Sequence, residues 1–422
     1  MNKKWIISSL CLVLMMTACG KDELIDKQQT QQLENAQTLA AKERSEILGK
    51  MDPKIVKAEN AFGLRIHQEL SKLGTGENVL ISPYSLSSGL ALAYNGSAGE
   101  TAKQMESVLG WTGMERSKVN EANKGLRMLL EQGGGVTLSI ANSIWIQNGF
   151  KMKEPYLNQV EDAYGAEIKM ADLSHEDSLK EINGWVDQNT NGMIKSIYSE
   201  PPGGKAVLIN AIYFNGGWMD EFDPELTEEK NFNLADGSVK KLPMMKQEKR
   251  FAYKESDKWQ AVRLPYGDGR MHMLVIVPSK ESSLDELQKE LWKNPKVWQD
   301  GYEPNMVKLE LPKFKAELST ELSEQLVGVL KKAGMKDAFD DMKADFSDMA
   351  EDPLYIERIG HKVVVDVNEK GTEAAAVTAI AMTSGAPEPT EPVEMIVDRP
   401  FFFAIEDRDT GAWLFMGSIT NP

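Results

Sequence analysis

The residues from Thr372 to Met382 have the pattern of a strand that could form main-chain hydrogen bonds inside a sheet. Successive side chains of a strand point to opposite faces. The single charge of this run, Glu373, therefore lies on one face. The other face is uncharged and begins with four small residues; its members are Thr372, Ala374, Ala376, Thr378, Ile380 and Met382. Such a segment could enter the middle of a sheet without burying a charge.

The continuation of this segment predicts the opposite environment. Residues 385–392 read Gly-Ala-Pro-Glu-Pro-Thr-Glu-Pro, a composition typical of a solvent-exposed loop. On the other side, Val363–Val367 is an apolar run that predicts a strand, and Gly371 would let the chain bend back on itself. A loop that is also a latent central strand is a conformational switch.

Side chains and motifs typical of enzymes are sparse in this sequence. It contains no Gly-x-Ser-x-Gly, no His-Glu-x-x-His, no Walker-type glycine loop and no cysteine pair of the metal-binding kind. Of the four histidines, which are His67, His175, His272 and His361, only His175 has an adjacent acid, Glu176, and it lacks a second histidine. We therefore expect His175 to be solvated, and we expect no enzymatic activity, no metal and no cofactor.

Composition and the N-terminus restrict the class of protein. The net charge of -16 argues against nucleic acid as a partner. Lys3 and Lys4 precede the apolar run Trp5–Met16 and then Thr17-Ala18-Cys19-Gly20, the organisation of a cleaved export signal that is too short to span a membrane. Because the only cysteines are Cys11 and Cys19, we expect an exported domain without disulfides.

The rest of the chain predicts a mixed α+β domain that begins near Asp52-Pro53, after a polar tether that is helical in part. Helices are expected at Ala58–Leu73, Tyr84–Tyr94 and Leu322–Ala333, and a buried strand at Val207–Phe214. Val136–Ile146 is a short apolar run interrupted by serine and asparagine. From Phe251 onward strands dominate, with runs at Ala261–Leu264, Met271–Val277, Met306–Leu311, Val363–Val367, Met395–Val397, Phe401–Ile405 and Trp413–Met416.

Several stretches, in order and at family spacing, resemble the serpins. They are Asn78–Leu86, Leu208–Trp218 with Phe222-Asp223-Pro224 and Thr227, Asn368–Ile380, Asp398–Phe401 and Phe415–Pro422. The resemblance implies a single large serpin domain over residues 53–422. It implies an α+β fold with a central, mainly antiparallel sheet, further smaller sheets, about eight or nine helices, and an exposed reactive loop at about 369–397.

The resemblance also implies a suicide-substrate inhibitor. In this family a protease cleaves the loop, and the N-terminal part of the loop then enters the central sheet while the acyl-enzyme is trapped. About 14 inserted residues would carry the cut end on the order of 45 Å. The hinge residues would be Glu369, Gly371, Thr372, Glu373, Ala374, Ala375, Ala376 and Thr378. Their small, uncharged insertion face indicates an inhibitory member.

Other residues match the parts of the serpin sheet that must open. Ser82, Ser85, Asn210 and His361 match the shutter, a polar cluster under the centre of the sheet, and Trp218 matches the breach, where insertion starts. Hydroxyl, amide and imidazole groups exchange hydrogen bonds as strands part, which an aliphatic core does not. The alternative for Ser82 is an ordinary helix cap.

The family spacing places the scissile bond at Gly385–Ala386, with Met382–Thr383, Thr383–Ser384 and Ser384–Gly385 as alternatives. No Lys or Arg lies between Lys370 and Arg399, which disfavours trypsin-like targets. Small residues and methionine favour an elastase-like serine protease, and a papain-like cysteine protease is the alternative. A further alternative is a non-inhibitory serpin that acts as a binding module.

The N-terminus resembles a bacterial lipoprotein signal. It implies a signal peptide at residues 1–18, a lipid on Cys19, and a tether that completes residues 19–52. We therefore expect a monomer anchored to the outer membrane of the cell envelope, exposed at the surface or extracellular. Its protein partner would be the target protease, held covalently.

Overall fold

The computed structural model describes residues 41–73, 76–131, 134–294, 300–372 and 391–422. Residues 41–50 form a helix within one compact unit, and Met51–Pro422 form the other. None of the helices in these ranges is both long and apolar enough to cross a membrane.

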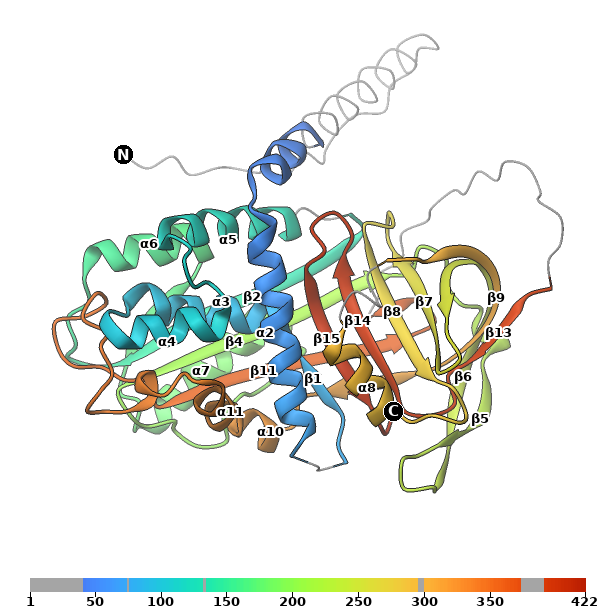
Figure 1. Ribbon diagram of the computed structural model, residues 1–422. Coiled ribbons are helices and arrows are strands. Elements are labelled where there is room, and N and C mark those ends of the chain that lie inside the picture. The colour runs from blue at the N-terminus through green and yellow to red at the C-terminus, as the bar shows by residue number, and fades with distance from the viewer. Residues whose placement is uncertain (1–40, 74–75, 132–133, 295–299, 373–390) are drawn as a thin grey trace, which may run out of the picture. The chain divides into compact units, whose positions relative to one another are not determined.

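A six-stranded sheet contains the segments that matter for insertion. Its order is β10 (Phe314–Glu317), β11 (Arg358–Asn368), β12 (Gly371–Thr372), β4 (Ala206–Gly217), β2 (Val136–Gln147) and β3 (Glu167–Ala171). β2 and β4 are antiparallel, whereas β11 and β4 also pair directly and are parallel. The long strands β2, β4 and β11 run side by side (Figure 1).

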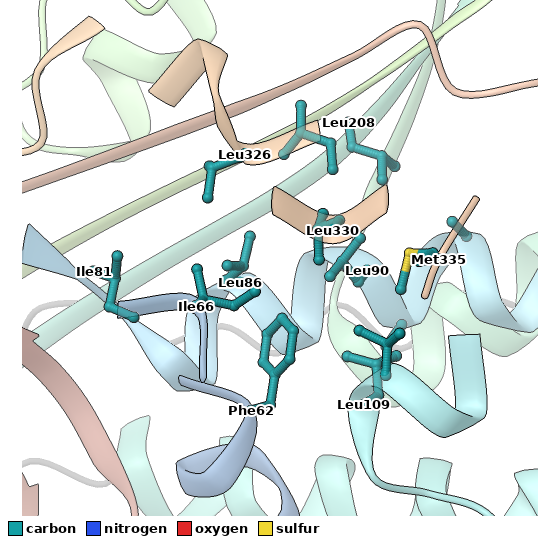
Figure 2. Close-up of a cluster of buried hydrophobic side chains, with 14 of the residues drawn as sticks. Phe62, Ile66, Ile81, Leu86, Leu90, Leu109, Leu208, Leu326, Leu330 and Met335 are labelled. Carbon is teal, nitrogen blue, oxygen red and sulfur yellow. The ribbon is translucent and has the colours of Figure 1, made fainter. Parts of the chain in front are cut away.

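Helices cover both faces of this sheet. On one face lie α2 (Pro53–Ser71), α3 (Pro83–Gly96), α4 (Gly99–Leu109), α5 (Arg116–Glu131) and α6 (Glu154–Tyr164). Phe62, Ile66 and Leu90 pack there with Leu208 of β4, as Figure 2 shows. On the other face α7 (Glu176–Asn189) packs through Trp185 and Val186. The apolar run of β4 is therefore buried on both sides, as its sequence indicates.

A second array has nine strands: β1 (Val79–Ile81), β5 (Glu228–Asn233), β6 (Val239–Glu255), β7 (Trp259–Tyr266), β8 (Met271–Pro278), β9 (Glu303–Pro312), β13 (Val393–Ile396), β14 (Phe401–Asp407) and β15 (Trp413–Ile419). The resemblance implies separate smaller sheets, but here β6 is 17 residues long and pairs with β5, β7 and β9. β6 thereby joins β5, β7 and β9 into one sheet. α8 (Leu284–Lys293) contacts β8 and β14.

The α+β fold is confirmed, and nine α-helices lie within the described part of Met51–Pro422. One expected helix is wrong: Leu322–Ala333 is two helices, α10 (Thr320–Glu324) and α11 (Leu326–Ala333). The apolar spacing is continuous across the break. The Ser323 hydroxyl, however, bonds the main chain of His361 on β11, so a tertiary contact holds α10 against the sheet.

Candidate strand-insertion site

The strand β12 lies between the ends of β4 and β11. Gly371 and Thr372 pair antiparallel with Asn368 and Val367 of β11 on one side and with Gly217 and Gly216 of β4 on the other. Beyond β12, β4 and β11 pair directly with each other, from Val207–Arg358 to Tyr213–Val364. β12 therefore separates β4 from β11 at one end, and beyond it the two strands meet directly along a closed seam.

Gly371 occupies a position that requires glycine. Its φ is 147°, a conformation that residues with a Cβ rarely adopt. A Cβ at this position would overlap the carbonyl oxygen of Gly216 and lie 2.7 Å from Cα of Gly217. Glycine therefore allows the chain to reverse from β11 and press against the end of β4.

Aromatic side chains form the floor beneath β12. Thr372 is fully buried, and its hydroxyl lies 2.7 Å from the hydroxyl of Tyr266. The ring of Tyr266 stacks on Trp218 with centroids 4.3 Å apart. The indole N–H of Trp218 donates to the carbonyl of Asn368 at 2.9 Å. The predicted breach residue Trp218 thus contacts the turn that leads into the hinge.

Glu369 anchors the start of the hinge. Its carboxylate accepts a hydrogen bond from the Thr227 hydroxyl at 2.9 Å and pairs with Lys313 at 2.8 Å. Burial opposes the charge, but the hydrogen bonds from Lys313 and Thr227 outweigh it and hold the pKa of Glu369 below its usual range. The Glu369 carbonyl also accepts from the N–H of Phe222. These contacts fix the turn before Gly371.

The structure brings the four predicted shutter residues together under the centre of the sheet. Asn210 of β4 is the hub: its Oδ1 accepts from the Ser85 hydroxyl at 2.7 Å and lies 2.7 Å from Nδ1 of His361. Its Nδ2 donates to the Ser85 carbonyl and to Oδ1 of Asn142. The network joins α3, β2, β4 and β11.

Ser82 enters this network through its main chain. Its N–H points to Nε2 of His361 at 3.4 Å, while its hydroxyl accepts from the Ser85 N–H and caps α3. The cap and the contact with His361 therefore coexist.

His361 is a neutral imidazole in this setting. Complete burial lowers its pKa to about 3. Because Nε2 accepts from Ser82, Nδ1 carries the proton and donates to Asn210. The ring thus joins β11 to β4 by one directed hydrogen bond at the level where these two residues are also paired in register.

Two further members of the network have no counterpart among the predicted site residues. Asn142 lies on β2 and accepts from Asn210 at 2.6 Å, and Ser323 on α10 bonds both main-chain groups of His361. The available signal for Asn142 was a polar residue inside the otherwise apolar run Val136–Ile146. Ser323 gave no such signal, because a serine on a helix is ordinary.

The remaining predicted site residues lie outside the described ranges. They are Cys19 and, in the loop, Glu373, Ala374, Ala375, Ala376, Thr378, Met382, Thr383, Ser384, Gly385 and Ala386. The chain is described again at Glu391 and enters β13, which pairs parallel with β9. His175 caps α7 with a largely exposed ring, as expected of a solvated residue. Across the described segments no cluster of three or more metal-binding side chains occurs.

Comparison with known proteins agrees with this geometry. A family model described as "Serpin (serine protease inhibitor)" matches residues 57–422. An uncharacterised serpin-like protein of Thermococcus kodakarensis is 37% identical, with 87% of this chain and 86% of that protein covered. The leukocyte elastase inhibitor of Bos taurus is 32% identical, with 86% and 98% covered.

Solved structures give the same result. The crystal structure of a thermophilic serpin, tengpin, in the native state superposes with a TM-score of 0.79 at 30% identity, covering 88% of this chain and 95% of that one. Serpins are typically protease inhibitors that form complexes with target proteases, and they are not typically enzymes. On the family match, the identities and the fold, this chain belongs to the serpin family.

Proposed function

We propose that this protein inhibits a protease as a suicide substrate, by inserting its cleaved loop between β4 and β11. The observation that carries the proposal is β12, which occupies the first two positions of the new strand. A protease that acylates the loop beyond Thr372 would be carried along the sheet as the strand extends. Its active site would be distorted before water releases it.

The register of β12 supports insertion along the whole seam. Each further residue of the loop moves one position back along both β4 and β11. Thr378, six residues after Thr372, would therefore lie opposite Asn210 on one side and His361 on the other. Asn210 and His361 are now register partners of each other. β4 and β11 must move apart within the sheet, but neither strand has to shift along its own axis.

Side-chain chemistry along this register is also compatible with insertion. Residues that share the face of Thr372 would point into the interior, where small uncharged side chains fit without burying a charge. Thr378 would bring a hydroxyl to the Asn210–His361 network, which would otherwise lose a hydrogen bond. Glu373 would lie between Asn215 and Asp366, both only partly buried, so its charge would stay near water.

The backbone energetics favour the inserted state. The seam is one parallel ladder, and insertion replaces it by two antiparallel ladders, which are slightly more stable per residue. Each inserted residue would have main-chain partners on both sides. Cleavage frees the loop from its second attachment at β13, where Val393–Ile396 pairs with β9, so the gain becomes available only after the cut.

We propose that the target is an elastase-like serine protease. It would cut the loop at Gly385–Ala386 or at one of the preceding bonds. Around these bonds the loop has small and methionine side chains, and no Lys or Arg lies between Lys370 and Arg399. A relative at 32% identity bears the name leukocyte elastase inhibitor. A papain-like cysteine protease is the alternative target.

The test is a mixture of the chain from Met51 onward with pancreatic elastase, separated on a denaturing gel. The expected result is a band at the summed mass that survives boiling, and sequencing of the released peptide identifies the scissile bond. Papain serves as the second protease. Complete cleavage without such a band for either enzyme would contradict inhibition and favour a non-inhibitory binding module.

We also propose that residues 1–18 are removed as a lipoprotein signal and that Cys19 carries a lipid that anchors the protein, as a monomer, at the outer surface of the cell envelope. The support is the order of basic, apolar and small residues before Cys19. In a bacterial host, the wild-type chain should incorporate labelled palmitate and Cys19→Ser should not. Equal labelling of both would contradict the anchor.

A further inference from the structure

A cavity of about 400 Å³ lies at the N-terminal end of β11, within the size range of about 300–1,000 Å³ that is usual for small-molecule sites. It borders the shutter network at His361 and Ser323. One wall is the connection Ile197–Glu200, which follows α7. The other is formed by Glu357 and the start of β11, as far as Lys362, together with α10 and α11.

The two walls belong to opposite sides of the seam. Asn183 of α7 holds the connection by hydrogen bonds with the N–H and carbonyl of Tyr198 and with the N–H of Ile197. α7 packs on β2 and β4, and the connection leads into β4. On the other wall, Ser323 ties α10 to His361 of β11. A ligand that contacts both walls would therefore link β4 to β11.

The existing contacts between the walls are weak. Arg358 reaches Glu200 only at 3.6 Å, and both side chains are substantially exposed, so this ion pair contributes little. The Tyr198 hydroxyl lies over Gly360, where a Cβ would be 2.9 Å from it. That hydroxyl is buried and has no hydrogen-bond partner among the described residues.

Main-chain groups of β11 also face this cavity. β10 pairs with β11 only from Val364 to Val367, and Ser323 bonds both main-chain groups of His361 on the same side. Since main-chain groups two residues apart point the same way, those of Ile359 point toward the cavity. No described strand pairs with Ile359 on that side, and such an edge accepts an extended peptide.

Charges of both signs surround this edge. Arg358 and Lys362 share one face of β11 with Gly360 between them, and their Cα atoms are about 13 Å apart by strand geometry. Glu200 and Glu324 supply carboxylates at the rim. Lys362 now pairs with Glu317 at 3.2 Å, and the Glu317 side chain is exposed. A peptide carboxylate can therefore replace Glu317 at Lys362 and Glu200 at Arg358. A peptide ammonium fits the acids, and an apolar side chain fits against Ile197.

We propose that this cavity binds a short extended peptide with free, charged ends, and that the bound peptide holds β4 and β11 together. The second part rests on the proposed function, because it assumes that β4 and β11 separate during insertion. The peptide binds the closed sheet better than the opened one, so by linkage it opposes insertion.

Binding is tested first on the full, uncleaved chain by calorimetric titration with the tripeptide Ala-Leu-Ala. We expect saturable binding of the free tripeptide and at least tenfold weaker binding of its acetylated, amidated form. Ser199→Trp, which fills the cavity, should abolish binding, and Lys362→Met should weaken it at least tenfold. Lys315→Met, on β10 outside the cavity, is the matched control and should bind normally.

Equal affinity for the capped peptide, or full affinity in Lys362→Met, would overturn the site. Cooperative thermal unfolding shows whether each variant is folded. If Ser199→Trp does not fold, the affinities of Lys362→Met and Lys315→Met for Ala-Leu-Ala are compared instead, and their difference decides whether the peptide binds in this cavity.

The coupling is tested by cutting the loop and repeating the titration. Insertion is scored separately, as a rise in the unfolding midpoint of the cut chain. With that rise present, we expect affinity for Ala-Leu-Ala to fall at least tenfold, and saturating peptide to increase the share of protease released uncomplexed. A raised midpoint with unchanged affinity would overturn the coupling. No rise would overturn the proposed insertion and the coupling with it, while the binding result stands by itself.

Discussion

The two ends of the seam between β4 and β11 differ in what holds them. At the hinge end the strands are already separated by Gly371 and Thr372, and the contacts are main-chain bonds over an aromatic floor. At the shutter end the strands pair directly, and a network of buried amide, hydroxyl and imidazole groups joins them. In the proposed mechanism the first end begins the insertion and the second end resists it.

This difference indicates how one sheet can be both stable and able to open. The ladder at the seam is parallel, the weaker kind. The shutter adds side-chain bonds that an incoming hydroxyl, that of Thr378 in the proposed register, can replace. An aliphatic cluster in the same place would have nothing to exchange and would lose contacts outright when the strands part.

The largest effect is expected at the hinge from Thr372→Arg. Thr372 is fully buried against Tyr266, and an unpaired guanidinium there would be too costly for insertion to proceed. We expect cleavage to continue while covalent complex falls at least 100-fold, measured by densitometry of denaturing gels. The matched control is Glu373→Arg, one residue along and on the opposite face. Equal loss in both variants would contradict the proposed register.

Gly371→Ala should have the next largest effect. The added Cβ would overlap Gly216 in a backbone conformation that alanine rarely adopts. We expect β12 to leave the sheet and the rate of complex formation to fall about tenfold, by stopped-flow kinetics. Gly411→Ala is the control, since it has a positive φ of 72° in open space. An unchanged rate in Gly371→Ala would show that the inserted start of the strand is not needed.

At the shutter, Asn210→Leu tests the closed end of the seam. It leaves the Ser85 hydroxyl and His361 Nδ1 without their buried acceptor, which destabilises the uncut protein by about 3 kcal/mol. We expect a lower unfolding midpoint and conversion to an inactive form on mild warming. Asn215→Leu, on the same strand with its amide bonded to the Tyr213 hydroxyl, should shift the midpoint much less. Equal shifts would contradict a special role for the network.

The smallest effect concerns the scaffold behind the shutter. Burial raises the pKa of Glu59 to about 8. Both carboxyl oxygens lack a hydrogen-bond partner among the described residues. Because the folded pKa lies above the unfolded value of 4.5, the native state retains a proton that the unfolded chain loses. Stability therefore falls as the pH rises from about 4.5 to 8.

Glu59→Gln should remove this slope and raise the free energy of unfolding by on the order of 2–3 kcal/mol at pH 7. Thermal midpoints between pH 5 and 8 measure it. Since α3 carries Ser82 and Ser85, we expect slower spontaneous conversion with no change in the hinge. Parallel pH profiles for the variant and the wild type would show that Glu59 is already paired.

Much of this fold follows from sequence because its central strands are apolar on both faces. Val207–Phe214 and Val363–Val367 are such runs, and both are strands. The pattern fails for β2, where Ser139, Asn142 and Ser143 interrupt the apolar run. Asn142 is tolerated there because its hydrogen-bond partner, Asn210, lies opposite it on the neighbouring strand β4. A partner on another strand leaves no local signal.

Strands with a solvated face were missed for the same kind of reason. The hairpin of β5 and β6 carries Lys230, Lys240 and Lys241 among its alternating residues. Where one face of a strand contacts solvent, charged residues neither indicate nor exclude the strand. The hinge partners Thr227, Tyr266 and Lys313 also come from distant segments. Such contacts arise only when the chain is folded, whereas Gly371 and the small residues after it are specified locally.

The most direct test of insertion through the seam is a reversible clamp across it. Ala211 of β4 and Lys362 of β11 are register partners, and neighbouring strands meet the Cα spacing that a disulfide needs. In a chain from Met51 onward, Ala211→Cys with Lys362→Cys would supply the only thiols. When oxidised, the chain should be cleaved by elastase without covalent complex, and reduction should restore the complex. Equal complex formation in both states would contradict insertion between β4 and β11.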